Sequence, residues 1–298
     1  MHILLSGASG FLGSACVDLL SRLPEIELSV VRSSQVECVL PLGSREILLP
    51  DVQDRRHLER ALSPRLPTHI IHVAALSSPS ACENYPELAA RANVDFTNTL
   101  LELGASAGAH VLVTSTDLVF DGAAAPLGGF SESDEPNPIS VYSCSKFEAE
   151  NLTRSYQAGC VVRLSLLYGH TLSKSRGVLG WMEEQFHARQ ELALFKDEFR
   201  TPVHVADAAH AIVELSRTSQ TGLFHCGGPE RMSRVDFGVA VAEALGYDSS
   251  LVVPTLRGAV PTSPARPADV SLNSELLAGS MGFSPRRVRD ALRNELSL

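Results

Sequence analysis

Short apolar runs alternate with segments of helical periodicity through the first half of the chain, and this alternation allows few architectures. The predicted strands are residues 2–6, 27–32, 46–49, 68–75, 110–115 and 160–167. The predicted helices are residues 14–23, 55–62, 85–107, 206–216 and one that carries Tyr142. Such an alternation builds βαβ crossovers and a parallel sheet, whose strands are apolar on both faces. The sequence therefore predicts an α/β fold, a doubly wound parallel sheet of the Rossmann type.

The pattern loosens after residue 168, where prolines and loop residues become more frequent. We expect residues 1–168, with 201–224 returning to them, to form a nucleotide-binding domain. Segments 169–200 and 225–298 are then expected to form a smaller substrate-binding lobe. Ligands of open α/β sheets bind at the carboxyl ends of the strands, so the lobe should cover that edge.

Composition argues against several partners. The chain of 298 residues has a net charge of -9, so no overall positive field attracts nucleic acid or an anionic membrane. Its six cysteines are scattered without metal-ligand spacing, which predicts no metal site and a reducing compartment. An apolar run from His2 leaves no room for a signal peptide, and no run is long enough to span a membrane. We expect a cytoplasmic protein.

A glycine-rich turn joins the first strand to the first helix, with the spacing Gly7-x-x-Gly10-x-x-Gly13. Glycines at these points allow a tight turn, approach of a pyrophosphate to the backbone, and close packing of helix on strand. The helix N-terminus adds partial positive charge. The predicted cofactor contacts here are Gly7, Ser9, Gly10, Phe11, Leu12 and Gly13.

The end of the second strand distinguishes the two nicotinamide cofactors. It reads Arg32-Ser33-Ser34, with no acid until Glu37, and an arginine accommodates a 2′-phosphate. This favours NADP over NAD. Asp51 and Val52 are predicted to contact the adenine, although Asp51 is equally suited to capping a helix. Ala74 and Ala75, at the end of strand 68–75, complete the predicted cofactor residues.

Tyr142 and Lys146 stand one helical turn apart and therefore share a helix face. An ammonium group favours the phenolate, so Lys146 is expected to lower the Tyr142 pKa for proton transfer, and both residues are expected to contact the cofactor. A solvated helix face is the alternative for this pair alone. Hydroxyls at the end of strand 110–115, among them Thr116, are expected to hold a substrate carbonyl.

Four segments resemble the extended short-chain dehydrogenase/reductases, and within them the dTDP-4-dehydrorhamnose reductase branch. They are Gly7-Ala-Ser-Gly-Phe-Leu-Gly13, Ser115-Thr-Asp-Leu-Val-Phe-Asp-Gly122, Tyr142-Ser-Cys-Ser-Lys146 and Arg266-Pro-Ala-Asp-Val-Ser-Leu-Asn-Ser274. Departures from the usual pattern are Leu118 in place of Tyr, Ser143 in place of Gly, and Asp269 with Val270.

The resemblance implies that Thr116, rather than Ser115, is catalytic beside Tyr142 and Lys146. It implies NADPH-dependent reduction of the 4-keto group of a nucleotide-linked deoxysugar, and a possible homodimer. A non-catalytic NADP-binding regulatory subunit and a sugar-nucleotide epimerase remain alternatives. A 4,6-dehydratase is disfavoured because Leu118, not a second acid, follows Asp117.

Three residues are predicted to contact the substrate. The resemblance implies an arginine or a turn beside the substrate near Arg200, so Arg200 is expected to meet a diphosphate, and a surface ion pair is the alternative. Arg266 is expected to touch the substrate's nucleotide, or else to be structural, and Asp117 either lines the pocket or bonds locally to backbone. Asn93 is expected near the active site or on the surface. His204 is expected in the core or a turn, and Trp181 in packing of the lobe.

Overall fold

The computed structural model describes residues 1–32, 40–172 and 177–296. Their central sheet has the order β11-β6-β5-β4-β1-β2-β3, and every strand pair in it is parallel. The strands are β1 (His2–Ser6), β2 (Glu27–Arg32), β3 (Arg45–Leu48), β4 (His69–His72), β5 (His110–Thr116), β6 (Gly159–Leu164) and β11 (Gly222–Cys226). The order reverses between β1 and β4, the point where such sheets open a crevice. The predicted fold class is confirmed.

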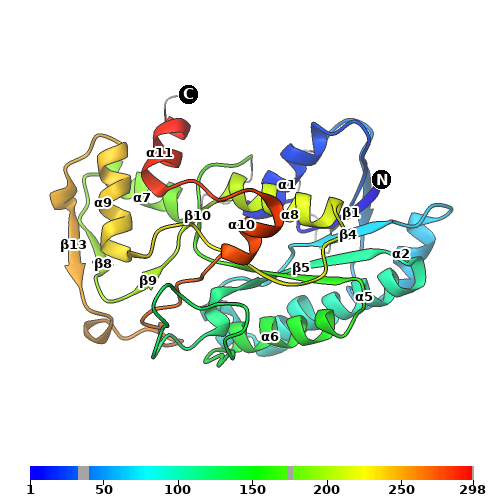
Figure 1. Ribbon diagram of the computed structural model, residues 1–298, viewed down its shortest axis with the longest axis horizontal. Coiled ribbons are helices and arrows are strands. Elements are labelled where there is room, and N and C mark those ends of the chain that lie inside the picture. Colours follow the sequence, from blue (N-terminus) through cyan, green and yellow to red (C-terminus); the bar gives the residue numbers. More distant parts are fainter. Residues whose placement is uncertain (33–39, 173–176, 297–298) are drawn as a thin grey trace.

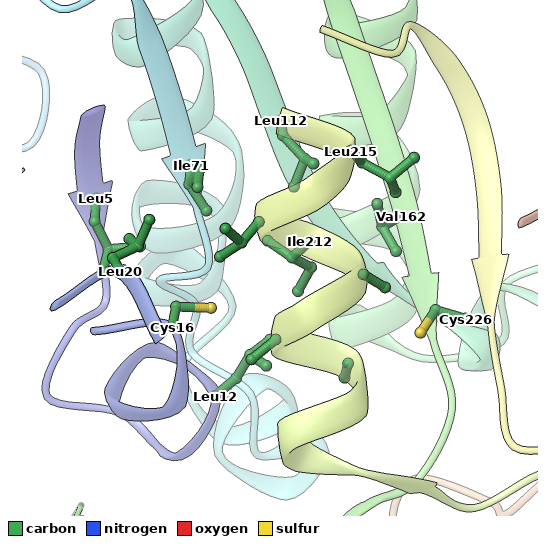
Figure 2. Close-up of a cluster of buried hydrophobic side chains, with 14 of the residues drawn as sticks. Leu5, Leu12, Cys16, Leu20, Ile71, Leu112, Val162, Ile212, Leu215 and Cys226 are labelled. Atoms are coloured by element: carbon green, nitrogen blue, oxygen red, sulfur yellow. The ribbon is translucent and has the colours of Figure 1, made fainter. Parts of the chain in front are cut away.

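Helices cover both faces of this sheet (Figure 1). One face carries α1 (Phe11–Ser21) and α8 (Val205–Arg217), and the other carries α2 (Arg55–Leu62), α5 (Phe96–Ala107) and α6 (Val141–Arg154). Consecutive strand residues serve opposite faces, since Ile71 packs under α8 whereas Ile70 packs under α5. Figure 2 shows Ile212 and Leu215 of α8 above the strands. Burial of each side chain of this size contributes about 1.5–3 kcal/mol to the free energy of folding.

The predicted helix 85–107 is divided in the structure. It consists of α4 (Pro86–Ala90), a π-helical segment η1 (Arg91–Asp95) and α5, and α3 (Pro79–Asn84) precedes it. The π-helical segment contains Asn93, whose amide accepts a bond from Leu76 N at 2.8 Å and donates one to Ser145 Oγ at 2.9 Å. Asn93 thereby ties the loop after β4 to α6, and the surface alternative for this residue is wrong.

A second group of elements lies beyond the end of the sheet, around β8 (Leu192–Phe195), α9 (Arg234–Ala244) and β13 (Val252–Thr255) (Figure 1). Its core contains Phe186, Leu194 and Phe237. Trp181, expected in this packing, is instead 43% exposed. The remaining elements are η2 (Asp117–Val119), β7 (Leu167–Tyr168), α7 (Gly177–His187), β9 (Phe199–Arg200), β10 (Val203–His204), β12 (Met232–Ser233), η3 (Ser249–Leu251), η4 (Arg257–Ala259), α10 (Glu275–Met281) and α11 (Val288–Leu296).

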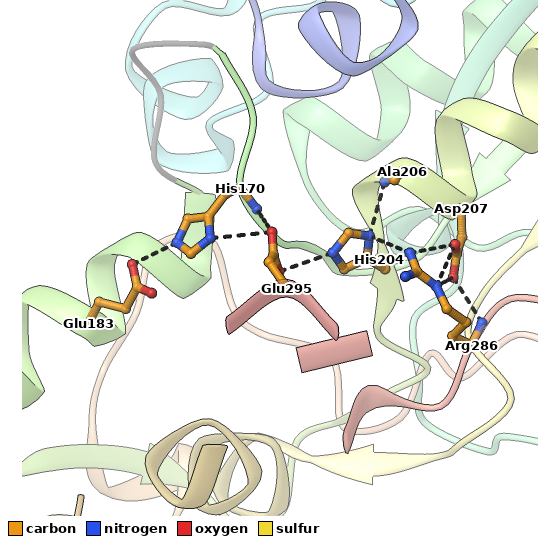
Figure 3. A network of polar contacts seen from close by, with 7 residues as sticks. All are labelled: His170, Glu183, His204, Ala206, Asp207, Arg286 and Glu295. Carbon is orange, nitrogen blue, oxygen red and sulfur yellow. Dashed lines mark hydrogen bonds and ion pairs between the residues drawn. The ribbon is translucent and has the colours of Figure 1, made fainter. Parts of the chain in front are cut away.

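A polar network holds α11 against the rest of the chain (Figure 3). The Glu295 carboxylate lies between His170 and His204, with its Oε2 3.1 Å from His204 Nε2. His204 Nδ1 accepts from the backbone N–H of Ala206 at 3.2 Å and so caps α8, in agreement with the interpretation as a turn histidine. In the described part of the chain, every helix is too short or too polar to cross a lipid bilayer.

Candidate active site

A cavity of about 810 Å³ opens at the carboxyl ends of β1, β4 and β5. It brings together residues that were predicted from motifs far apart in the sequence. The predicted residues on its lining are Gly7, Ser9, Gly10, Phe11, Leu12, Gly13, Arg32, Val52, Ala74, Ala75, Thr116, Tyr142, Lys146, Arg200 and Arg266. Asp51 and Asp117 are not among the described lining residues.

The glycine turn forms a tight cradle at one part of this cavity. Gly7 has φ +83°, and a Cβ there would lie 2.6 Å from Ala74 N. A Cβ on Gly13 would lie 1.9 Å from Gly7 O, so helix and strand meet too closely for any side chain. Gly10 is the N-cap of α1 and brings no side chain to bond the first N–H groups of that helix. This backbone is suited to a pyrophosphate.

Arg32 lines the cavity but is already engaged. Its Nε lies 2.5 Å from Glu46 Oε1, across the pairing of β2 with β3. The predicted contribution of Ser33 and Ser34 lies outside the described residues. Asp51 Oδ1 accepts a hydrogen bond from Gln53 N at 3.2 Å and lies 3.4 Å from Arg91 Nη2. Asp51 thus stabilises a local turn and forms an ion pair, and it does not line the cavity.

The start of α6 determines where Tyr142 and Lys146 point. Ser140 and Ser143 form a reciprocal capping box, and the backbone N–H of Val141 donates to Glu83 Oε1 at 2.8 Å. Tyr142 and Lys146 are 9% and 2% exposed, respectively, and both line the cavity. The two residues therefore do not form a solvated helix face.

The pKa directions at this pair follow from burial. Burial raises the pKa of Tyr142 to about 12, with the Thr116 hydroxyl opposing the shift. Burial also lowers the pKa of Lys146 to about 8, against the attraction of Glu150. The Tyr142 pKa is therefore raised, contrary to the expectation that Lys146 brings it down, because desolvation of the phenolate outweighs the charges around it.

Thr116 is both a helix cap and a residue of the cavity lining. Its Oγ1 accepts from Leu118 N at 3.2 Å, which caps the short helix η2, while the residue also lines the cavity. Asp117 lies behind it, fully buried, and accepts from Arg200 Nε at 2.6 Å, from Arg200 Nη2, and from Ser165 Oγ at 2.8 Å. Burial raises the pKa of Asp117, and these donors oppose the shift. The structure thus puts Asp117 under Arg200 instead of on the cavity lining.

Arg266 reaches the cavity from the loop before α10. Its guanidinium donates to both carboxylate oxygens of Glu198, at 2.5 and 2.7 Å, and its side chain is 40% exposed. Glu198 and Ser115 also line the cavity, and Glu198 is a polar group of the site that the sequence does not predict. Ser115 Oγ is buried without a hydrogen-bond partner in the described residues. Ser115 belongs to the motif that contains Thr116, whereas Glu198 belongs to none of the motifs in the sequence.

Comparison with protein families matches residues 1–297 to the family of the RmlD substrate binding domain. A relative named as a probable low-salt glycan biosynthesis reductase, Agl14 of Haloferax volcanii, is 27% identical over 98% of this chain and 96% of its own length. Methionine adenosyltransferase 2 subunit beta of Bos taurus is 28% identical over 96% of this chain and 84% of its length.

Solved structures agree on the fold. A dTDP-4-dehydrorhamnose reductase of Clostridium acetobutylicum superposes with a TM-score of 0.84 at 25% identity, covering 100% of this chain and 99% of its own. The dTDP-4-dehydrorhamnose reductase of Bacillus anthracis, solved in complex with NADP, has a TM-score of 0.84 at 21% identity, over 99% of this chain and 98% of its own. The relatives thus include reductases and also a subunit of another enzyme.

Proposed function

We propose that this chain, which belongs to the RmlD substrate binding domain family, reduces the keto group of a nucleotide-linked deoxysugar with NADPH. The observation that carries the proposal is the meeting of Thr116, Tyr142 and Lys146 with the glycine turn in one cavity. The best-fitting substrate is dTDP-4-dehydro-L-rhamnose, and hydride transfer to C4 is the chemistry that the bound cofactor would supply.

The residues present fit such a cofactor. The Gly7 and Gly13 positions exclude any Cβ, which leaves bare backbone for a pyrophosphate, and Arg32 lies near the end of β2, where a 2′-phosphate would bind. Ser115 Oγ adds a buried hydroxyl still in need of a partner. In this proposal Lys146 holds the ribose hydroxyls of the cofactor, which is the role that the family resemblance implies.

Tyr142 is proposed as the acid that protonates the substrate oxygen. Because burial raises its pKa to about 12, the phenol is protonated at neutral pH and ready to donate. The Thr116 hydroxyl is proposed to hold the carbonyl, since Thr116 is close enough to Tyr142 to influence its pKa. Arg200 and Arg266 are proposed to face the substrate's phosphates, and segments 169–200 and 225–298 to form most of the substrate lobe.

Cofactor titration followed by a turnover assay tests this function. Purified protein is titrated with NADPH and NADH, and absorbance of the nicotinamide is then followed after adding dTDP-4-dehydro-L-rhamnose. We expect loss of absorbance that slows about 10²- to 10⁴-fold in Tyr142→Phe. Tyr85→Phe is the matched control, because Tyr85 is 63% exposed and does not line the cavity. If NADPH binds but is not oxidised, the choice of substrate is contradicted. If neither NADPH nor NADH binds, the proposed cofactor site is contradicted.

A second candidate is a cofactor-binding subunit of another enzyme. The specific observation in its favour is the Bos taurus relative, which is named as a subunit of methionine adenosyltransferase 2. Tight NADPH binding, recovery of a stoichiometric enzyme partner and no oxidation of any keto-sugar nucleotide would support this candidate. A stereocentre scrambled without loss of NADPH would instead indicate an epimerase.

A further inference from the structure

Three arginines surround one buried carboxylate at the part of the cavity next to Thr116. Glu198 is 2% exposed, and the positive charges of Arg200, Arg234 and Arg266 all favour its ionised form. Burial alone would raise the pKa of Glu198, but the three guanidinium groups together lower it, so Glu198 is an anion at neutral pH. Asp117 is the second carboxylate here and is taken up by Arg200. Three guanidinium groups therefore share two buried carboxyl groups.

The three arginines differ in how free they are to meet a ligand. Arg200 is held in a two-point bond to the fully buried Asp117. Arg266 is also bonded at two points, to Glu198, but its side chain is 40% exposed and lines the cavity. An incoming anion can therefore reach Arg266 at lower cost than Arg200, provided that Glu198 finds another partner.

Arg234 is placed to be that partner. It is the first residue of α9, and its backbone N–H donates to Glu198 O at 3.0 Å, which fixes the two residues side by side. Its Nε lies 3.9 Å from Glu198 Oε1, too far for a hydrogen bond, and its Nη1 is buried without a hydrogen-bond partner among the described residues. Burial lowers the pKa of Arg234 to about 10, so the group stays cationic at neutral pH.

A buried guanidinium N–H without an acceptor is costly. We propose that Arg234 replaces Arg266 as the hydrogen-bond partner of the Glu198 carboxylate when a phosphate of the substrate binds Arg266. Glu198 thus exchanges its bonds to Arg266 for bonds to Arg234. Arg234 is then a positioning residue for recognition of a diphosphate, and it acts through Glu198 without touching the substrate. The inference rests on the proposed function for the identity of the ligand, and two of its three residues, Glu198 and Arg234, belong to none of the motifs in the sequence.

Binding of two probes, dTDP and inorganic pyrophosphate, tests the exchange by calorimetry on NADP-saturated protein. We expect Arg234→Gln to weaken the binding of both probes about tenfold, because Glu198 then stays on Arg266. Glu198→Gln should remove this dependence. In the double variant Glu198→Gln with Arg234→Gln, which loses one charge of each sign, both probes should bind at least as tightly as in the unaltered protein. Arg287→Gln is the control, since its side chain is 70% exposed.

The outcomes separate this inference from the proposed function. If Arg234→Gln weakens probe binding equally in the unaltered protein and in Glu198→Gln, the exchange is overturned in favour of general electrostatic attraction. Failure of the unaltered protein to bind either probe would overturn it as well. If keto-sugar reduction proceeds while Arg234→Gln leaves its KM unchanged, the exchange fails and the function stands. If the double-variant pattern appears but no substrate is reduced, the exchange stands and the function fails.

Discussion

Asp117 and Arg200 form a buried two-point ion pair between η2, which follows β5, and β9. Asp117 also accepts from Thr116 Oγ1 at 3.3 Å, so the pair sits directly beneath a proposed catalytic hydroxyl. The contact joins an end of the central sheet to a segment 83 residues later in the chain. Its integrity therefore concerns both the stability of the fold and the position of Thr116.

Breaking this pair from one side should be strongly destabilising. Asp117→Asn leaves the buried Arg200 guanidinium without its counter-charge, and we expect a loss of about 3–5 kcal/mol in the free energy of unfolding. Replacing both partners, as Asp117→Leu with Arg200→Met, should cost less than the single change. Urea denaturation of the three proteins measures this, and a single change costing under about 1 kcal/mol would contradict the prediction.

Glu46 should control the preference between the two nicotinamide cofactors. Its carboxylate occupies Arg32, the residue proposed to meet a 2′-phosphate, and it would repel that phosphate. We expect Glu46→Gln to raise the ratio of NADPH to NADH affinity by about tenfold, as measured by fluorescence titration. Glu27→Gln provides the control, because Glu27 pairs with Arg65 at the exposed start of β2, the strand that ends at Arg32. An unchanged ratio would separate Arg32 from cofactor choice.

A methyl group at Gly13 should destroy the cofactor cradle. The added Cβ would lie 1.9 Å from Gly7 O, and backbone on both sides would have to move. We expect Gly13→Ala to lose NADPH binding and to unfold at a lower temperature, since overpacking of this kind costs about 1–3 kcal/mol or more. In Gly258→Ala the Cβ meets open space, so that variant should bind and melt as the unaltered protein does. Normal NADPH affinity in Gly13→Ala would count against the cradle.

Acid should destabilise the fold through two buried histidines. Burial, with Lys146 nearby, lowers the pKa of His72 to about 3, and burial, with Arg163 nearby, lowers that of His225 to about 3. Both are neutral in the folded chain but take up protons near pH 6.5 when unfolded. The free energy of unfolding should therefore fall as the pH drops from about 6.5 to about 3, by up to about 1.4 kcal/mol per pH unit for each histidine.

Urea denaturation at several pH values checks this slope. His72→Asn should lose less stability on acidification than the unaltered protein, by close to one proton's contribution. Its stability at pH 7 is compared separately, because His72 also bonds to Ser6 Oγ at 2.5 Å and Thr97 Oγ1 at 3.1 Å. Identical pH dependence of the two proteins would refute the assignment of a proton to His72.

Local pattern predicts six of the seven strands of the central sheet, but neither β11 nor the charges of the site. Helix 55–62 and strand 27–32 have the predicted bounds, because the helix buries one face and the strand is an apolar run buried on both faces. The π-helical segment around Asn93 has no such signal, since the insertion depends on a bond to Ser145 from another helix. The Tyr142 pKa was predicted in the wrong direction because burial is a tertiary property. Glu198 and Arg234 were missed because their partners lie in distant segments.

The position of β11 has a consequence for synthesis on the ribosome. This strand pairs with β6 at the edge of the central sheet, and Leu277 of α10 joins the core that Ile3 and Leu5 of the first strand begin. Until residue 226 has emerged, the edge of β6 offers unpaired backbone groups, which are a template for aggregation. The sheet and the core that the amino-terminal segments begin are therefore complete only after residues 226 and 277 have been translated.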